Sequence, residues 1–361
     1  MRLLIDASTL EGGGITHLSN ILLYGKFQEY EEVVLIAREK YKDKLKIHKN
    51  MIFYESDNMN LILLYGLKIH KIAAQHNVDC VLATNGLYIG TKKTIIICHN
   101  FLPFDMRTAY EYYPIKSILK NILLRFVYSI SYRSSNIVIF LSDFVLKKVT
   151  QMIKIKRSII LPHGIENVSI YINKQKLKSK IGVHKFVYTS SFEPYKNHKI
   201  LFQACKILKD KGYNFHIDLI GSGTKIQRSS IIQLIDYFEL KDIVNLIGNL
   251  TQNELFDRYQ SYDTGLFLSS CENLPNILIE YLALGLPVLS TDIGPMNSIM
   301  GVNDAWKVSA DDTDELSHKM EKRLNNNLPV FDFNYDFFKC YYSWKRVAFE
   351  IDANLFKVLN E

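Results

Sequence analysis

The chain has 361 residues, of which 48% are hydrophobic and 22% charged, so it is long enough for two domains with hydrophobic cores. Its formal charge of +7 suits an anionic partner, and nucleic acid, an acidic membrane surface and a phosphorylated small molecule all fit that charge. The five cysteines are an odd number without a CxxC pair, which argues against a disulfide framework and against a cysteine zinc site.

Short β-branched runs alternate with amphipathic segments along most of the chain. A first series of strands is expected at Arg2–Ile5, Val33–Ile36, Cys80–Ala83, Thr94–Cys98, Asn136–Leu141 and Ser158–Leu161. A second series is expected at Lys185–Thr189, His216–Ile220, Val244–Ile247, Thr264–Leu268 and Pro287–Ser290. Helices are expected at His198–Lys211, Ile226–Phe238, Asn253–Tyr262, Asn276–Leu284 and within Asn334–Leu359. The expected strands do not alternate strictly between polar and apolar residues, and helices separate them. This pattern predicts two doubly wound parallel α/β sheets.

A polar, lysine-rich stretch separates the two series of strands. We expect an N-terminal Rossmann-like domain over residues 1–165, a linker over 166–184 and a second Rossmann-like domain over 185–334. The last segment, 335–361, is expected to be a helix that packs back on the N-terminal domain. Ligands of such sheets bind at the carboxyl ends of strands, near the point where the strand order reverses. The active site is therefore expected in a cleft between the two domains.

The segment from Ser269 to Pro287 carries two glutamates eight residues apart. A predicted strand ends at Ser269, a loop carries Glu272, and Pro275 begins a helix that contains Glu280. Proline costs little in a first turn, and the free N–H groups there form an anion site that suits a diphosphate. Glu280 would then reach ribose hydroxyls and Glu272 sugar hydroxyls. The alternative is that both glutamates are solvated surface residues.

Other candidate residues follow predicted strands. Gly12, Gly13 and Gly14 follow the first strand, where a tight turn needs small residues and a ligand can approach closely. Lys196 follows the first strand of the second series and could neutralise a departing diphosphate, although a lone lysine is more often a solvated charge. His99 ends an apolar strand, where histidine ordinarily has a structural role.

The ordered set of segments resembles glycosyltransferase family 4, the retaining enzymes of the GT-B fold. The signature of that family, Ser-x-x-Glu, seven residues, a second Glu and a Gly-Leu-Pro-Val strand, is matched by Ser269, Glu272, Glu280 and the run Gly285–Val288. Further segments that resemble the family, in chain order, are DASTLEGGGITHL, ICHNFLPF, FLSDFVLKKV, ILPHGI, SSFEPYKNHKILFQA, LIGSGT and a closing helix with Ser343, Trp344 and Ala348. The resemblance covers almost the whole chain.

This resemblance implies an N-terminal acceptor-binding domain and a C-terminal domain that binds a nucleoside diphosphate sugar. It implies that Glu272 orients the sugar, that Lys196 neutralises the diphosphate and that His99 closes the site from the N-terminal domain. The residues expected to bind the donor are Gly13, Gly14, Asn197, Leu274, Pro275, Asn276 and Glu280. The implied reaction transfers a hexosyl group with retained configuration and uses neither a cofactor nor a metal.

The chain departs from the family near Lys196. The family usually has an arginine close to this lysine, whereas the candidate positions here hold Ser191 and Tyr195. Either another cation, such as Arg228 or Lys225, takes its place, or phosphate binding depends more on backbone amides. The missing arginine also supports an alternative, namely a non-catalytic protein of this fold that binds nucleotide sugars. A further alternative is a nucleotide-sugar 2-epimerase.

Two short motifs favour other functions and are set aside. Asp312-Thr313-Asp314 matches the DxD metal motif of another glycosyltransferase fold, but it precedes a helical stretch in which Asp is expected as a cap. The run GSGTK at 221–225 suggests a P-loop, but it lacks the Walker spacing and the Lys-Ser/Thr ending. No motif supports nucleic-acid binding.

Two stretches of the N-terminal half bear on the acceptor. Leu61–Lys71 and Tyr112–Arg133 interleave apolar and aromatic residues with basic ones, which suits either a helix on an anionic membrane surface or a core-facing helix with a solvated basic face. The family resemblance favours membrane contact and an acceptor that is a growing glycan or is linked to undecaprenyl diphosphate, in O-antigen, capsule or exopolysaccharide synthesis. Without a signal peptide or a spanning segment, we expect a cytoplasmic chain that is peripheral on the inner face of the bacterial plasma membrane.

Overall fold

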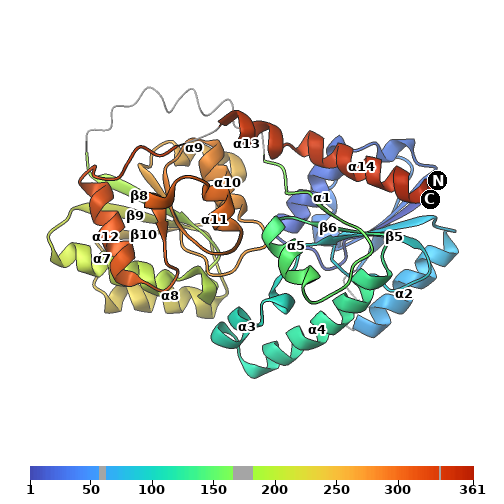
Figure 1. Ribbon diagram of the computed structural model, residues 1–361, viewed down its shortest axis with the longest axis horizontal. Coiled ribbons are helices and arrows are strands. Elements are labelled where there is room, and N and C mark those ends of the chain that lie inside the picture. The colour runs from blue at the N-terminus through green and yellow to red at the C-terminus, as the bar shows by residue number, and fades with distance from the viewer. Residues whose placement is uncertain (57–61, 166–181, 333–334) are drawn as a thin grey trace. The chain divides into compact units, whose positions relative to one another are not determined.

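The computed structural model describes residues 1–56, 62–165, 182–332 and 335–361 (Figure 1). Contacts divide the chain into two compact units, which we name unit 1 (Met1–Gly164 with Cys340–Glu361) and unit 2 (Ile165–Lys339). Of the predicted linker, 166–184, all but the last three residues lie outside the described residues.

Unit 1 contains a seven-stranded parallel sheet with the order β3-β2-β1-β4-β5-β6-β7. Its strands are β1 Arg2–Asp6, β2 Glu32–Ala37, β3 Met51–Glu55, β4 Cys80–Ala83, β5 Lys93–Cys98, β6 Ile137–Phe140 and β7 Ser158–Ile160. Its helices are α1 Gly13–Tyr24, α2 Ile62–Gln75, α3 Met106–Tyr112, α4 Ile115–Ser134, α5 Asp143–Thr150 and α14 Trp344–Asn360. Figure 1 shows α1 and α14 on one face of the sheet and α2 and α4 on the other. Because both faces are covered, the central strands are apolar at consecutive positions.

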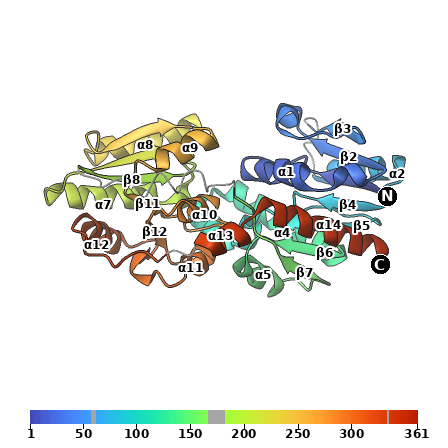
Figure 2. The ribbon, with the colours of Figure 1, turned by 90° about the horizontal axis from the view of Figure 1, so that it is seen from above.

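The C-terminal segment differs from the single helix that the sequence predicts. It forms α13 (Tyr335–Tyr341) and α14, because Ser343 has an extended backbone (φ −101°, ψ 128°) that interrupts the helical path. α14 packs against α1 and β5 (Figure 2). Its buried stripe consists of Trp344, Val347, Ala348, Ile351, Leu355 and Val358. The spacing of three or four residues is that of one helix face, which explains why this helix is held on unit 1.

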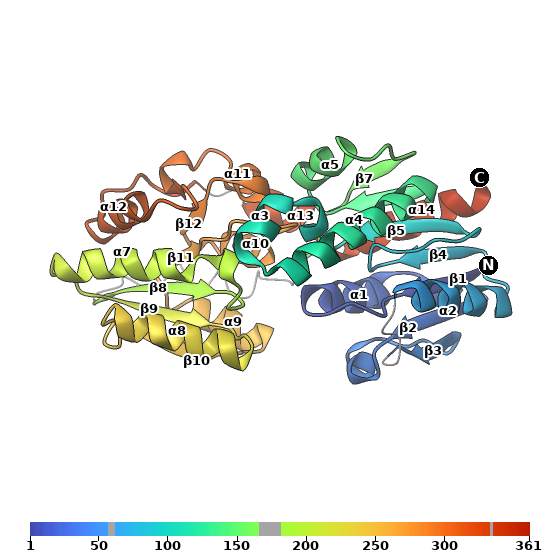
Figure 3. The same ribbon diagram turned by 90° about the horizontal axis from the view of Figure 1, so that it is seen from below.

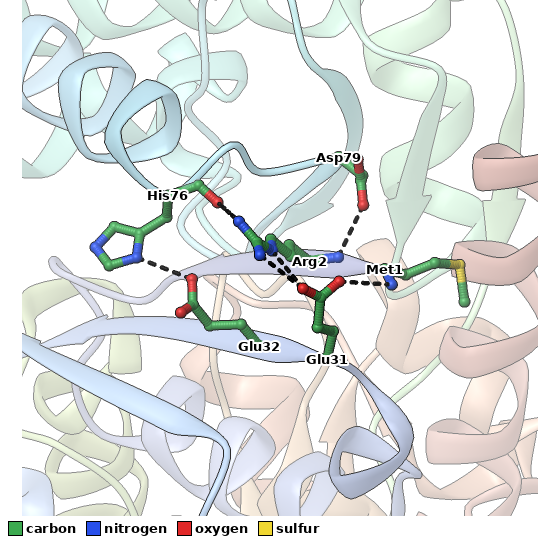
Figure 4. Close-up of polar contacts among 6 residues, drawn as sticks. All are labelled: Met1, Arg2, Glu31, Glu32, His76 and Asp79. Carbon is green, nitrogen blue, oxygen red and sulfur yellow. Dashed lines mark hydrogen bonds and ion pairs between the residues drawn. The ribbon is translucent and has the colours of Figure 1, made fainter.

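The amino ends of the strands in unit 1 carry a polar cluster (Figure 4). The backbone N–H of Arg2 donates to Asp79 at 2.8 Å, and its guanidinium donates to Glu31 and, at 3.4 Å, to the carbonyl of His76. His76 Nδ1 lies 2.9 Å from a carboxylate oxygen of Glu32. The contacts of Arg2 with Asp79 and Glu31 are exposed, so each contributes little to stability. The cluster lies at the amino edge of the sheet, opposite to the carboxyl edge at which ligands of such sheets bind.

Unit 2 contains a six-stranded parallel sheet with the order β10-β9-β8-β11-β12-β13. Its strands are β8 His184–Thr189, β9 Phe215–Ile220, β10 Val244–Gly248, β11 Thr264–Phe267, β12 Val288–Thr291 and β13 Lys307–Val308. Its helices are α7 His198–Asp210, α8 Lys225–Tyr237, α9 Gln252–Tyr259, α10 Asn276–Ala283, α11 Gly294–Met300 and α12 Thr313–Leu324. α7 and α8 cover the face turned to the viewer in Figure 3. This is the strand order of dinucleotide-binding sheets, and it reverses between β8 and β11.

The predicted fold class, two Rossmann-like α/β sheets, is confirmed. Every predicted strand is present, and the boundaries differ from those expected by one residue at most. The two described strands that the sequence analysis missed are both at sheet edges. β3 begins with four apolar or aromatic residues, Met51–Tyr54, but only one of its five residues is buried, and β13 has only two residues.

Candidate functional site

The carboxyl ends of β8 and β11 lie where the strand order of unit 2 reverses, and the two strands are hydrogen-bonded neighbours. A single 3-10 turn, Pro194–Lys196, follows β8, and the loop that carries Glu272 follows β11. Because parallel neighbours end at the same edge, the two loops leave the sheet next to each other. The predicted residues Lys196 and Glu272 are 76 positions apart in the sequence and meet here.

Lys196 and Glu272 form an ion pair, with Lys196 Nζ donating to Glu272 Oε1. The two side chains are only 12% and 15% exposed, so this pair is largely removed from water. The ammonium also lies over two aromatic rings, 5.2 Å from the ring centre of Tyr195 and 5.6 Å from that of Phe267. An anionic ligand could replace Glu272 as the partner of the lysine ammonium. The carboxylate of Glu272 could then accept hydrogen bonds from hydroxyl groups of the ligand.

Asn197 ties the two loops together. Its backbone is left-handed (φ 56°, ψ 35°), a conformation that Asn adopts more readily than most residues. Its buried side-chain amide donates to the carbonyl of Leu268 at 2.8 Å, to Ser270 Oγ at 2.6 Å and to the carbonyl of Ala310 at 3.1 Å. The structure thus gives this amide a bracing role, and its predicted contact with a donor stays a prediction.

Two tyrosines from the helices hold the end of β8. The backbone N–H of Thr189 donates to Tyr281 Oη at 3.0 Å, and the hydroxyl of Tyr259 donates to Thr189 Oγ1 at 3.0 Å. Burial raises the pKa of both tyrosines well above the usual value, which keeps their hydroxyls protonated. Gly265 of β11 makes room for this arrangement, since a Cβ there would lie 2.7 Å from Tyr281 Cδ2. The sequence analysis missed these tyrosines, and the glycine within an apolar strand was the available signal.

The loop after β9 approaches the end of β8 through Gly221. This residue has φ +135°, and a Cβ on it would lie 2.0 Å from the carbonyl oxygen of Ser190, so only glycine fits. The hydroxyl of Ser190 lies 3.0 Å from Nε2 of the buried His198. Burial, and secondarily the charge of Lys196, lowers the pKa of His198 to about 3, so its ring is neutral behind the ion pair.

The start of α10 provides fewer amides than the sequence analysis expected. Pro275 occupies the position before the helix and has no N–H to donate. The N–H of Asn276 donates to the carbonyl of Leu274 at 3.0 Å. Of the amides expected to hold a diphosphate, those of Leu274 and Ile277 are therefore the candidates. This is a correction for Asn276 as an amide donor, whereas the predicted contact of Pro275 with a donor did not depend on an N–H and stays a prediction.

Glu280 lies on α10 and is 8% exposed. Its Oε1 accepts a hydrogen bond from Gln252 Nε2 of α9 at 3.3 Å. The alternative that Glu272 and Glu280 are solvated surface residues is therefore wrong, because both carboxylates are largely buried and both accept hydrogen bonds. Their roles toward a sugar and a ribose stay predictions.

The candidates of unit 1 lie at the carboxyl edge of its sheet. Gly12 precedes α1 with φ 50°, and Gly13 and Gly14 are the first residues of that helix. A Cβ on Gly14 would lie 2.9 Å from Leu10 Cδ2, the end of a flexible side chain, so this contact alone does not require glycine there. His99 follows β5 and its Nε2 lies 3.0 Å from Nδ1 of His17, a partner that the sequence analysis missed.

The structure also shows where the residues discussed in place of the family's arginine lie. Tyr195 lies beside the ammonium of Lys196, as described above, whereas Lys225 and Arg228 are exposed residues of the first turn of α8. Among the described residues, no hydrogen bond or ion pair joins either of these two cations to Lys196 or Glu272.

Both motifs set aside in the sequence analysis have structural roles. Asp312 Oδ1 accepts a hydrogen bond from the N–H of Glu315 at 2.8 Å and so caps α12. Thr224 caps α8 in a capping box with Gln227. The sequence analysis expected the capping role of Asp312 and did not predict that of Thr224.

Residues 170–334 match the family model described as glycosyl transferases group 1. Among curated proteins, the chain is 25% identical over 172 residues to the capsular polysaccharide biosynthesis glycosyltransferase CapM of Staphylococcus aureus. That alignment covers 45% of this chain and 44% of CapM, so the chain matches less than half the length of this relative.

Solved structures resemble the chain over nearly its full length. The sucrose-phosphate synthase of Thermosynechococcus elongatus superposes with a TM-score of 0.75 at 14% identity, covering 99% of this chain and 98% of that chain. Anabaena Alr3699/HepE, solved in complex with UDP and glucose, gives a TM-score of 0.73 at 14% identity and covers 98% of both chains. These likenesses establish the GT-B fold for this chain.

The buried ion pair predicts a specific pattern of stability. We expect Lys196→Met and Glu272→Gln each to lower the free energy of unfolding by about 2 kcal/mol, because each leaves a largely buried partner without its counterpart. The double variant should recover at least half of the summed loss. Urea unfolding of the four proteins in a double-mutant cycle measures this coupling.

The exposed pair of Lys241 and Asp236 is the control, with side-chain exposures of 74% and 47%. Lys241→Met should change the free energy of unfolding by less than about 0.5 kcal/mol. Strictly additive losses at Lys196 and Glu272 would contradict the ion pair.

Proposed function

We propose that this protein is a retaining glycosyltransferase of family 4 that transfers a hexosyl group from a nucleoside diphosphate sugar to a lipid-linked or growing surface glycan. One observation carries the proposal. The Lys196–Glu272 pair is largely buried at the strand-order reversal of a dinucleotide-type sheet, directly before α10. A cation and a carboxylate at this place suit a ligand that has both phosphates and hydroxyl groups.

The residues of unit 2 would act by positioning and by electrostatic stabilisation. Lys196 and the amides of Leu274 and Ile277 would stabilise the diphosphate as the bond to the sugar breaks. Glu272 would orient the sugar and Glu280 the ribose. In a retaining front-face reaction, the departing diphosphate would accept the proton of the acceptor hydroxyl, so no side-chain nucleophile is required. This chemistry uses lysine rather than a metal to offset the leaving charge.

The comparisons support the donor and the setting of this proposal. Alr3699/HepE was solved with UDP and glucose, which makes a UDP-sugar the first donor to test. CapM is named for capsular polysaccharide biosynthesis, which supports an acceptor in a surface glycan. The proposed location is the cytoplasmic face of a bacterial plasma membrane. Among the described helices, none has the length and apolar character that crossing a bilayer requires.

Helix α4 supports a peripheral position at a membrane. The apolar side chains on its exposed stripe are Ile115, Leu119, Ile122, Leu123, Phe126 and Ile130. They recur every three or four residues, and the exposed basic residues Lys116, Lys120 and Arg133 accompany them. A core-facing helix with a solvated basic face, the other interpretation of this stretch, would not expose these apolar residues. An anionic bilayer would cover both the apolar stripe and the charges. The other stretch, Leu61–Lys71, lies partly outside the described residues.

A donor panel tests the function. We expect the purified chain to release UDP, GDP or dTDP from one sugar nucleotide of a panel, and we expect a lipid-linked glycan acceptor to stimulate the release. The product linkage should have the anomeric configuration of the donor, which NMR of the isolated product shows. Formation of an epimer without an acceptor would instead support a 2-epimerase, and tight binding without turnover a non-catalytic protein.

The site assignment predicts the effect of Glu280→Gln. This change preserves the shape of the side chain but removes the charge that would accept hydrogen bonds from the ribose. We expect the Kd for the donor identified above to rise about tenfold, since a hydrogen bond to a charged group is worth about 1.5–3 kcal/mol. Isothermal titration calorimetry measures it. Glu239→Gln, at a 73% exposed position of the same unit, should leave the Kd unchanged. Equal Kd values for Glu280→Gln and the wild type would refute this role.

The exposed stripe of α4 predicts membrane binding. We expect the wild type to cosediment with vesicles rich in phosphatidylglycerol, and we expect Phe126→Glu to weaken this binding at least tenfold. The reason is that burying such a side chain contributes about 1.5–3 kcal/mol. Phe349→Glu on α14, where the phenyl ring is 67% exposed against 65% for Phe126, is the matched control and should bind like the wild type. Equal losses in both variants, or no binding by the wild type, would contradict docking through α4.

A further inference from the structure

Three histidines of unit 1 come together from distant parts of the sequence. His17 lies on α1, His99 follows β5 and His163 follows β7. One ring nitrogen of each lies within 4.8 Å of those of the other two, and this is the one such metal-compatible group among the residues that the structure describes. His17 is 2% and His163 5% exposed. The cluster sits at the carboxyl edge of the sheet, where α/β proteins place their ligands.

The surrounding packing holds these rings in place. The ring centres of His17 and His163 are 4.4 Å apart, and those of His99 and His163 are 5.2 Å apart. The indole of Trp344 stacks on His17 at 5.6 Å and so covers the cluster from α14. A Cβ on Gly164 would lie 2.4 Å from the backbone nitrogen of Trp344, so only glycine allows the segment after β7 to approach this closely.

Two nitrogens of the cluster are polar atoms that the protein leaves unsatisfied. His17 Nε2 and His163 Nδ1 are buried and have no hydrogen-bond partner. A buried polar atom without a partner costs about 1–3 kcal/mol, so two in one cluster require an explanation.

We propose that His17, His99 and His163 bind a divalent transition-metal ion of the zinc type. Three neutral imidazoles are a ligand set typical of zinc, and they leave a fourth position for water. The ion would satisfy the two orphaned nitrogens and would link the glycine turn before α1, the end of β5 and the segment that supports α14. Its role would be structural. The observations that carry this proposal lie in unit 1 and do not depend on the sugar-transfer reaction proposed for unit 2, although His99 is also the residue that the family resemblance expects to close the site.

A metal titration of the full-length, untagged chain tests this site. After dialysis against a chelator, we expect the protein to take up one Co²⁺ per chain with the strong visible absorption of tetrahedral cobalt, and Zn²⁺ to displace it. Zn²⁺, but not Mg²⁺, should raise the melting temperature, because a ligand that binds only the folded state stabilises it. Elemental analysis of the dialysed samples gives the stoichiometry.

Single substitutions of the three histidines identify the ligands. His17→Gln, His99→Gln and His163→Gln should each weaken metal binding by more than the ~10–100-fold that loss of an outer-shell partner costs. His318→Gln, at an exposed position of unit 2, is the control and should bind like the wild type. Circular dichroism identifies the variants that keep the wild-type fold, and the comparison uses those.

Three outcomes would overturn the proposal. The first is no stoichiometric uptake by the wild type, with a melting temperature that does not respond to Zn²⁺, as expected if a buried water satisfies the two nitrogens. The second is undiminished binding by folded variants at the three positions. The third is an equal loss in His318→Gln. Sugar transfer measured on the same samples shows separately whether the reaction proposed for unit 2 occurs.

Discussion

Everything at the candidate site depends on the parallel pairing of β8 with β11. These strands are neighbours in the sheet although three helices and two strands separate them in the sequence. Their loops must therefore leave the same edge together, and this brings an ammonium and a carboxylate into contact. The surrounding residues maintain that edge: Asn197 joins the two loops, and Tyr281 passes over Gly265 to hold the end of β8.

Much of this fold could be predicted from the sequence because it follows from local patterns. Apolar runs mark strands that are buried on both faces, and their alternation with helices leaves few possible topologies. The edge strand β3 was missed although its first four residues are apolar or aromatic, and only one of its five residues is buried. The break at Ser343 was missed as well, because neither glycine nor proline lies near it to mark the end of a helix.

The site could be predicted less completely. Lysine and glutamate in the loops after predicted strands indicated which residues lie at the site. The contacts that these residues make depend on side-chain packing between segments that are distant in the sequence, and the sequence does not show this packing. For this reason the bracing role of Asn197 and the loss of the Asn276 amide to Leu274 were missed. The histidine cluster was missed for the same reason, since His17 and His163 are far apart in the sequence and only the sheet brings them together.

The Lys196–Glu272 pair has a further consequence for how an anionic ligand would arrive. With the two charges cancelling, the ligand-free pair generates little field at a distance, so it cannot itself attract a nucleotide from solution. Attraction would come from the net positive charge of the whole chain, which salt screens, whereas the largely buried pair is screened much less. Ionic strength would then govern the rate at which the ligand associates. The rate at which it dissociates would depend on how readily Lys196 exchanges the ligand for Glu272.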